Sequence, residues 1–382
     1  MDTTPLWIEA EAGLSGLFAA LLGRGYKTYG VVEEDGCFAF GPVARPEDLP
    51  RGRILNTEAG RVRSGAGATN RFFDKILPTQ GLKRFVHPAQ ETISRVDPDF
   101  TVSTPPPDAG KIAAIGVRAC DVAALGVLDR VFRKGPIADT RYASRREGLL
   151  IIAVDCAVPL ETCFCASMGT GPHATSGFDL AITEISESNG HGFLIRAGSD
   201  AGTEILNDLD CAQADDADLQ AVEAQKRAAV AAMGRQMPAN VEVAVKNGHD
   251  SQHWADVASR CLSCANCTMV CPTCFCSTVE DRNSLDGTAW RERRWDSCFS
   301  IDFTYIHGGG LRQSGESRYR QWMSHKLGHW HDQFGESGCV GCGRCIAWCP
   351  VGIDITKEAE VLAAEFERRS EPASQTVGDN NG

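Results

Sequence analysis

Short apolar runs alternate with amphipathic stretches in the first part of the chain. Residues 112–117 and 149–154 are continuous apolar runs, which is the pattern of strands buried on both faces of a sheet. The stretch 122–132 between them carries apolar residues at helical spacing, and residues 218–233, rich in Ala, Gln, Glu and Lys, predict a further helix. Strands that alternate with helices in this way predict an α/β domain over residues 1–237.

The pattern changes near residue 237. The stretch 237–250 contains Pro238, Asn247 and Gly248 and predicts a domain boundary. Beyond it the cysteine density rises sharply, with eleven of the seventeen cysteines between Cys261 and Cys349. We therefore expect residues 250–369 to form an α-helical ferredoxin-like domain packed around two prosthetic groups, followed by a polar, disordered tail at 370–382.

Two cysteine tetrads have the C-x2-C-x2-C-x3-C-P spacing of cubane-binding loops. Three cysteines of such a run face one cluster, and in two-cluster ferredoxins the fourth ligates the other cluster. A pair of zinc sites is the weaker alternative, because zinc needs only two C-x2-C knuckles. We therefore predict two [4Fe–4S] clusters with crossed ligand sets, Cys261, Cys264, Cys267 and Cys349 for the first and Cys339, Cys342, Cys345 and Cys271 for the second.

A candidate third cluster comes from the α/β part. Cys120 and Cys156 follow the predicted strands 112–117 and 149–154, and Cys163 and Cys165 come shortly afterwards. The carboxyl ends of parallel strands are where ligands bind in open α/β sheets, so these four thiols can converge on a metal cluster. The alternative, that they pack as small buried hydrophobes, stays open at this point.

The other cysteines and a histidine group are less informative. Cys274, Cys276 and Cys298 are only three thiols, so a cluster there would need a further ligand, and their role stays open. Cys37 and Cys211 have no nearby partners and are expected to be structural. His325 and His329 stand at i, i+4, but a lysine replaces the glutamate of the H-E-x-x-H motif. We therefore favour a surface or packing role for these histidines.

The composition and charge of the chain disfavour some classes of function and favour others. The 382 residues carry a formal charge of −12, which disfavours nucleic acid and favours protein partners. The N-terminus has no basic n-region and no run approaches the ~18 apolar residues of a membrane helix, so we expect a cytoplasmic protein without a membrane span. Seventeen cysteines without an export signal then indicate metal or redox chemistry rather than disulfides. No dinucleotide fingerprint or P-loop appears, and the glycine-rich stretch 63–69 is interpreted as a loop.

Several segments resemble a known family. The stretches CLSCANCTMVCPTCFC, RRWDSCFSIDFTYIHGG and CVGCGRCIAWCPVGIDI, with GVRACDVAALGVLDRVF and ETCFCASMGTGP earlier in the chain, are similar to the dicluster β subunit of NAD(P)-linked [NiFe] hydrogenases, also called sulfhydrogenases. The iron–sulfur subunit of anaerobic sulfite reductases shares this layout.

The resemblance implies an electron-transfer subunit that relays electrons between a flavin subunit handling NAD(P)H and a hydrogenase catalytic module. Two alternatives are an electron-transfer subunit of a sulfite or polysulfide reductase, and a scaffold whose clusters are purely structural. No catalytic residue is predicted in this chain itself.

Overall fold

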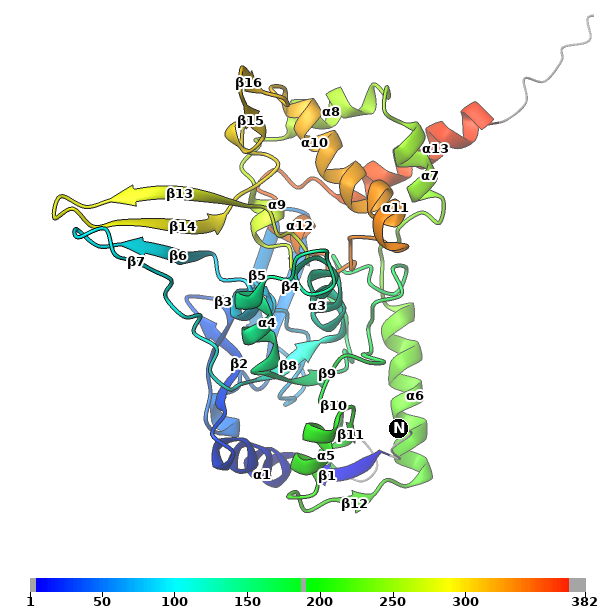
Figure 1. The fold of residues 1–382 in the computed structure, drawn as a ribbon. Helices are drawn as coiled ribbons and strands as arrows, with labels where there is room; N and C mark the ends of the chain where they lie inside the picture. Colours follow the sequence, from blue (N-terminus) through cyan, green and yellow to red (C-terminus); the bar gives the residue numbers. More distant parts are fainter. Residues whose placement is uncertain (1–4, 187–189, 371–382) are drawn as a thin grey trace, which may run out of the picture.

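An eight-stranded sheet organises the N-terminal part of the chain (Figure 1). The structure is a computed structural model and describes residues 5–186 and 190–370. In spatial order the strands are β12 (Ala212–Gln213), β1 (Leu6–Glu9), β11 (Gly192–Ala197), β10 (Leu180–Ile185), β9 (Leu149–Val154), β8 (Ile112–Arg118), β2 (Lys27–Glu34) and β3 (Cys37–Pro42). The four strands from β10 to β2 are parallel, and the outer strands join them in antiparallel orientation.

Alternate side chains of the central strands pack on opposite faces of this sheet. Ile151 belongs to the core that includes residues of α3 (Ala119–Phe132) and α4 (Thr140–Glu147), whereas Ile152 belongs to the core of α1 (Ala10–Gly23) and α5 (Asp200–Leu206). A strand buried on both faces must be apolar throughout, which explains why the runs 112–117 and 149–154 have no alternation. The predicted α/β character of this part is therefore confirmed. The predicted helix at 218–233 is α6 (Asp216–Ala231).

A second sheet projects from the body as an arm, drawn at the left of Figure 1. Its order is β13 (Ser277–Asn283), β14 (Ala289–Trp295), β6 (Gln90–Val96) and β7 (Val102–Ser103). β14 pairs antiparallel with β6, so a strand from the first hundred residues extends a hairpin of the cysteine-rich part. The sequence pattern predicted neither the hairpin nor this pairing.

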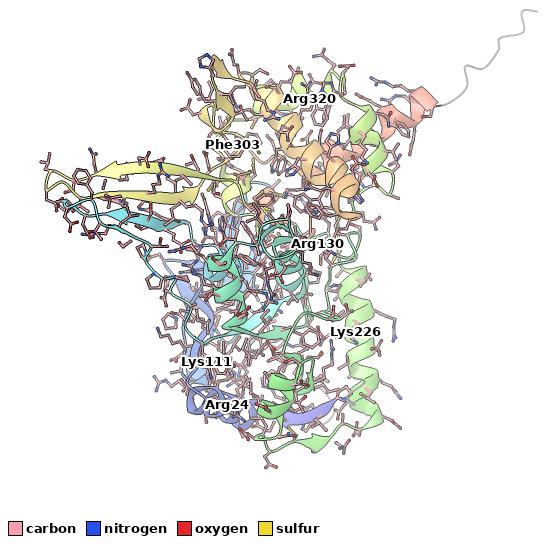
Figure 2. All side chains as sticks on the ribbon, viewed as in Figure 1. Arg24, Lys111, Arg130, Lys226, Phe303 and Arg320 are labelled. Atoms are coloured by element: carbon pink, nitrogen blue, oxygen red, sulfur yellow. The ribbon has the colours of Figure 1, made fainter. Side chains whose placement is uncertain are left out.

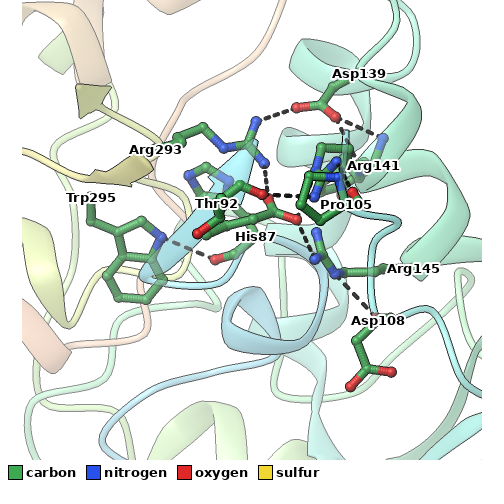
Figure 3. A network of polar contacts seen from close by, with 11 residues as sticks. His87, Thr92, Pro105, Asp108, Asp139, Arg141, Arg145, Arg293 and Trp295 are labelled. Carbon is green, nitrogen blue, oxygen red and sulfur yellow. Dashed lines mark hydrogen bonds and ion pairs between the residues drawn. The ribbon is translucent and has the colours of Figure 1, made fainter. Parts of the chain in front are cut away.

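A polar network fixes the inner end of the arm (Figure 3). Arg293 on β14 donates to Glu91 Oε2 over 2.8 Å and also pairs with Asp139. Trp295, the last residue of β14, donates from Nε1 to the His87 carbonyl over 3.0 Å. Because Glu91 is only 9% exposed, its charge needs these cationic partners, and the base of the hairpin is held in one position.

Helices surround the two cysteine loops in the C-terminal part. They are α8 (His253–Arg260), α9 (Asn266–Met269), α10 (Gly315–Ser324), the π-helical turn η3 (His325–His329), α11 (Trp330–Phe334), α12 (Arg344–Ala347) and α13 (Ile355–Ser370). Trp254, Leu327 and Leu362 are among the buried side chains of their common core. The stretch expected to be a domain boundary contains a further helix, α7 (Val241–Asn247), whose Val245 belongs to the same core.

The remaining elements are short. They are η1 (Pro46–Asp48), the hairpin β4 (Arg53–Glu58) and β5 (Arg61–Ala66), α2 (Lys83–Val86), η2 (Asp302–Thr304), and the hairpin β15 (Tyr305–Ile306) and β16 (Gly309–Gly310). The glycine-rich stretch 63–69 was interpreted as a loop, and this was wrong for residues 63–66, which pair with β4. Apart from Ser370, which ends α13, the predicted tail lies outside the described residues. No helix within the described ranges is long and apolar enough to cross a membrane.

Ion pairs join the N-terminal and C-terminal parts. Arg344 on α12 donates from Nη1 and Nη2 to the two carboxylate oxygens of Asp121 on α3, each over 2.8 Å. Both side chains are at most 1% exposed. A second, more exposed pair links Arg130 on α3, labelled in Figure 2, to Glu336. The buried bidentate pair sets the position of the second cysteine loop against the N-terminal sheet.

Candidate metal centres

The two cysteine loops follow the same backbone course. Ser263 and Ala265 have left-handed φ angles of 51° and 64°, and Gly341 and Gly343 occupy the corresponding positions with 64° and 72°. Each loop then runs into a single helical turn, α9 or α12, that carries the third cysteine of its tetrad. Left-handed residues let the chain turn tightly enough for three closely spaced thiols to face one side.

The second loop needs glycine for a further reason. A Cβ on Gly341 would lie 2.7 Å from the backbone of Cys165, and a Cβ on Gly343 would lie 2.2 Å from the carbonyl oxygen of Thr162. The backbone of Phe164 donates its N–H to the Gly341 carbonyl over 2.8 Å. The second loop is therefore packed directly on the cysteine-containing segment of the N-terminal part.

One thiol-lined cavity draws on both tetrads. Cys345 borders it together with the four thiols that the sequence assigns to the first cluster, Cys261, Cys264, Cys267 and Cys349. Backbone amides point at two of the sulfurs: Ser263 donates to Cys261 Sγ over 3.4 Å, and Ile353 donates to Cys349 Sγ over 3.3 Å. Such N–H···S bonds are a general feature of thiolate-ligated clusters, whose reduction potentials they raise.

Two buried aromatic donors also line this cavity. The Tyr319 hydroxyl and the Trp322 Nε1 are buried without a hydrogen-bond partner among the described residues. Burial, with added contributions from Glu358 and Cys267, raises the pKa of Tyr319 well above its ordinary value, so its hydroxyl stays protonated. An unpaired buried donor costs about 1–3 kcal/mol. Cluster sulfur in the cavity would accept from these donors, so the residues present fit a [4Fe–4S] group.

Cys271, the last cysteine of the first tetrad, lies near three cysteines of the second tetrad. Burial raises the pKa of the Cys345 thiol well above its ordinary value, and the adjacent thiols of Cys339, Cys342 and Cys271 raise it further. The Gly341 amide donates to Cys339 Sγ over 3.5 Å. Cys271 therefore lies near these three cysteines of the other loop.

A buried lysine accompanies Cys271. Lys326 Nζ donates to Cys271 Sγ over 3.5 Å, to Thr273 Oγ1 over 2.9 Å and to the Gly338 carbonyl over 3.2 Å. A hydrogen bond from Cys274 and this ammonium hold the pKa of Cys271 well below the ordinary thiol value. The site thus provides a fixed positive charge beside a thiolate, which favours electron uptake by a cluster bound there.

The four N-terminal cysteines also meet at one cavity. Cys120 lies in the first turn of α3 after β8, and Cys156 lies just beyond β9. These two, with Cys163 and Cys165, line a cavity at the carboxyl edge of the parallel strands. Burial raises the pKa of Cys163 to about 12, with Cys156 as the next cause. The Cys163 thiol donates to the Cys342 carbonyl over 3.6 Å, so this cavity adjoins the second tetrad.

The thiols of each candidate site border a common cavity, which a cubane can occupy because its iron and sulfide fill the centre. In residues 5–186 and 190–370, no group of three or more Cys, His, Asp or Glu side chains is placed to bind a single metal ion. Cys37 and Cys211 border none of the cavities described above.

The comparisons with known proteins agree with these features. Residues 260–353 match the family model of the 4Fe-4S dicluster domain. The chain is 34% identical to the sulfhydrogenase 2 subunit beta of Pyrococcus furiosus over 254 aligned residues. The aligned region covers 65% of this chain and 73% of that relative. The chain belongs to the sulfhydrogenase beta-subunit family. No solved structure matches it significantly.

Family membership confirms the resemblance seen in the sequence. The dicluster domain also confirms the prediction of a [4Fe–4S] electron-transfer subunit of the oxidoreductase class. Sequence reasoning missed the groups that this sulfhydrogenase-type subunit places around its thiols, namely Tyr319, Trp322, Lys326 and the Asp121–Arg344 pair. Arg344 stands inside the second tetrad, between Cys342 and Cys345, but the spacing of the cysteines does not predict its ion pair. Only the fold brings the other groups to the sites.

Proposed function

We propose that this subunit relays single electrons between a flavin subunit that handles NAD(P)H and a hydrogenase catalytic module. The observation that supports the proposal most directly is that three thiol-lined sites adjoin one another. Cys345 borders the first cavity although it belongs to the second tetrad, and the Cys163 thiol contacts the Cys342 carbonyl. Sites that share neighbouring residues in this way provide short steps for electron transfer through the chain.

The ligand sets proposed for the two clusters of the dicluster domain are crossed. Cys349 lines the cavity of Cys261, Cys264 and Cys267, which supports its assignment to the first cluster. The proximity of Cys271 to the other three supports the second set. Bound clusters would supply one-electron redox chemistry. The chain's own contribution is to present the thiolates, donate N–H and O–H groups toward sulfur, and exclude water from the sites.

We also propose a third cluster held by Cys120, Cys156, Cys163 and Cys165. Four thiols around one cavity at the carboxyl edge of a parallel sheet support this site. The apolar residues of its wall, including Ile76 and Leu160, would shield a cluster from solvent. The alternative of four independent packing cysteines does not explain why all four border the same cavity.

The sequence shows no nucleotide-binding motif, which supports the view that the nucleotide chemistry takes place on partner subunits. We propose that flavin and NAD(P)H chemistry lie on one partner polypeptide and hydrogen chemistry on others, with no role for nucleic acid. We propose that the subunit works in the reducing cytoplasm, where the thiolates that would bind the clusters stay reduced.

Anaerobic purification of the tagged chain from its own cells, followed by identification of the co-purifying polypeptides, tests the proposal. We expect a nickel-binding large subunit and a flavin subunit in stoichiometric amounts. A sirohaem-binding subunit in their place would assign the chain to a sulfite reductase instead. A chain that purifies alone, with full iron content, would contradict the relay proposal.

A further inference from the structure

Three cysteines outside the proposed ligand sets meet at the base of the arm. Cys276 directly precedes β13, and Cys298 follows β14 by three residues. The antiparallel pairing of these strands brings both ends together, and Asp296 donates its N–H to the Cys276 carbonyl over 2.9 Å. Cys274 lies two residues before Cys276. The hairpin therefore unites thiols that are more than twenty positions apart in the sequence.

These thiols share a further cavity, in addition to the two described above. It is lined by Cys274, Cys276, Cys298 and His325, with Phe303 (labelled in Figure 2) among its other residues. All three cysteines are half-buried free thiols. The cavity thus presents three sulfur donors and one imidazole to a common space.

His325 enters this cavity from the first position of the π-helical turn η3. Its ring lies edge-on to Phe275 at 6.5 Å and to Trp330 at 5.3 Å between centroids, so the imidazole is held by aromatic contacts. His329, four residues later, is 60% exposed and faces Asp332. The two histidines therefore do not act as a pair, and only His325 belongs with the thiols.

Positive charge accumulates around the same thiols. Arg312 and Lys326 line the cavity, and the Lys83 ammonium donates to the Cys274 carbonyl over 3.0 Å. Lys83 and Lys326 are only 5% and 8% exposed. Buried cations require nearby negative charge, and thiolates around a metal group would provide it.

We propose that Cys274, Cys276, Cys298 and His325 ligate a fourth iron–sulfur cluster at the base of the arm. Three thiolates and one imidazole nitrogen provide one protein ligand for each iron of a cubane. Three cysteine sulfurs and one imidazole are also the donors of a zinc site, and the metal analysis below distinguishes the two groups. The four side chains border one cavity, in which the cluster would lie.

The histidine gives this site a distinctive property. Imidazole is neutral where thiolate is negative, so a cluster with one histidine ligand accepts an electron more readily than one with four thiolates, as in centres where His replaces Cys. The site adjoins the second cluster, because Cys274 forms a hydrogen bond with Cys271. A fourth cluster here would extend the series of redox sites toward the arm.

Metal analysis of the full-length chain, purified anaerobically, tests the proposal. Cys276→Ser and Cys298→Ser should each lose about a quarter of the iron and sulfide, corresponding to one of four cubanes. Cys37→Ser, which changes a half-buried thiol away from every cavity described, is the matched control and should keep all of it. Unchanged iron in both variants, or one zinc per chain lost instead, would overturn the proposal.

A second measurement covers the case in which the cysteine variants do not fold. Pulsed EPR of the reduced wild-type chain, labelled with ¹⁵N-histidine, should show nitrogen coupling to one cluster. His325→Cys should abolish the coupling, retain the iron and shift one potential downward. Absence of coupling in the wild type would refute the His325 ligand. Neither readout depends on the redox partners of the chain, so failure here leaves the proposed relay function intact.

Discussion

Replacing Tyr319 with phenylalanine should lower the reduction potential of the first cluster. Tyr319 is 2% exposed, lies on α10, and its hydroxyl has no partner among the described residues. Besides Glu358, the charges that act on it include those of Cys267 and Cys261, which line the same cavity. An O–H···S bond to a bound cluster strengthens when the cluster gains an electron, because the acceptor becomes more negative. The hydroxyl therefore stabilises the reduced form.

The expected shift follows from the energy of one hydrogen bond. A bond to a charged acceptor contributes about 1.5–3 kcal/mol in total, and we assign about 1 kcal/mol of it to the difference between redox states. For one electron this corresponds to about 40 mV, so Tyr319→Phe should lower the potential by about that amount. Phenylalanine keeps the ring contacts with Trp254, Phe299 and Trp322, so packing should not change.

EPR-monitored redox titration of the full-length variant measures this shift. Tyr142→Phe is the matched control, since it also removes a buried hydroxyl, one that donates to Asp129 and lines none of the thiol cavities. The control should leave every cluster potential unchanged. An unchanged potential in Tyr319→Phe, or an equal shift in both variants, would show that the Tyr319 hydroxyl does not act on the cluster.

Three further predictions concern the ligand sets and the junction between the two parts. Cys271→Ser should perturb the spectrum of the cluster held by the second loop, and Cys349→Ser that of the first, as judged by EPR of the reduced proteins. Cys156→Ser should lose the iron of the N-terminal cluster, about four atoms by metal analysis, and leave both C-terminal clusters in place. Arg344→Met should destabilise the chain by about 3–5 kcal/mol in anaerobic denaturant unfolding, because it leaves the buried Asp121 carboxylate without its partner.

Each of these predictions has a contradicting result. Damage confined to the cluster whose own loop was mutated would show that the tetrads are not crossed. Iron loss in a Cys211→Ser control equal to that in Cys156→Ser would point to general instability rather than ligation. Unfolding of Arg344→Met at the wild-type denaturant concentration would show that the buried pair contributes nothing to the junction.

Local signals in the sequence predicted the central strands and the cluster loops. A parallel strand with both faces buried must be apolar throughout, so residues 149–154 are recognisable as β9 without any tertiary information. The tetrads are equally local, because their spacing alone lets three thiols reach one cubane. The thiols of the N-terminal set were expected together because Cys120 and Cys156 each follow a predicted strand, at the edge where ligands bind in open α/β sheets. The parallel pairing of β8 with β9 places the ends of these two strands side by side.

The features that the sequence did not predict depend on contacts between residues far apart in the chain. The pairing of β14 with β6 joins residues about two hundred positions apart, and no local periodicity encodes it. The stretch 63–66 was interpreted as a loop because of its glycines, yet pairing with β4 makes it a strand. Lys326 and Tyr319 are a lysine and a tyrosine in an ordinary helical sequence, and only the fold places them beside thiols.

Redox titration of the anaerobically purified full-length chain tests whether the cysteine-held clusters transfer electrons. We expect cluster signals that appear and disappear reversibly, each with one-electron Nernst behaviour and each lost when its own ligand set is mutated. Clusters that are present by iron and sulfide analysis but cannot be reduced and reoxidised would contradict electron transfer by this chain, and would mark them as structural groups of a scaffold.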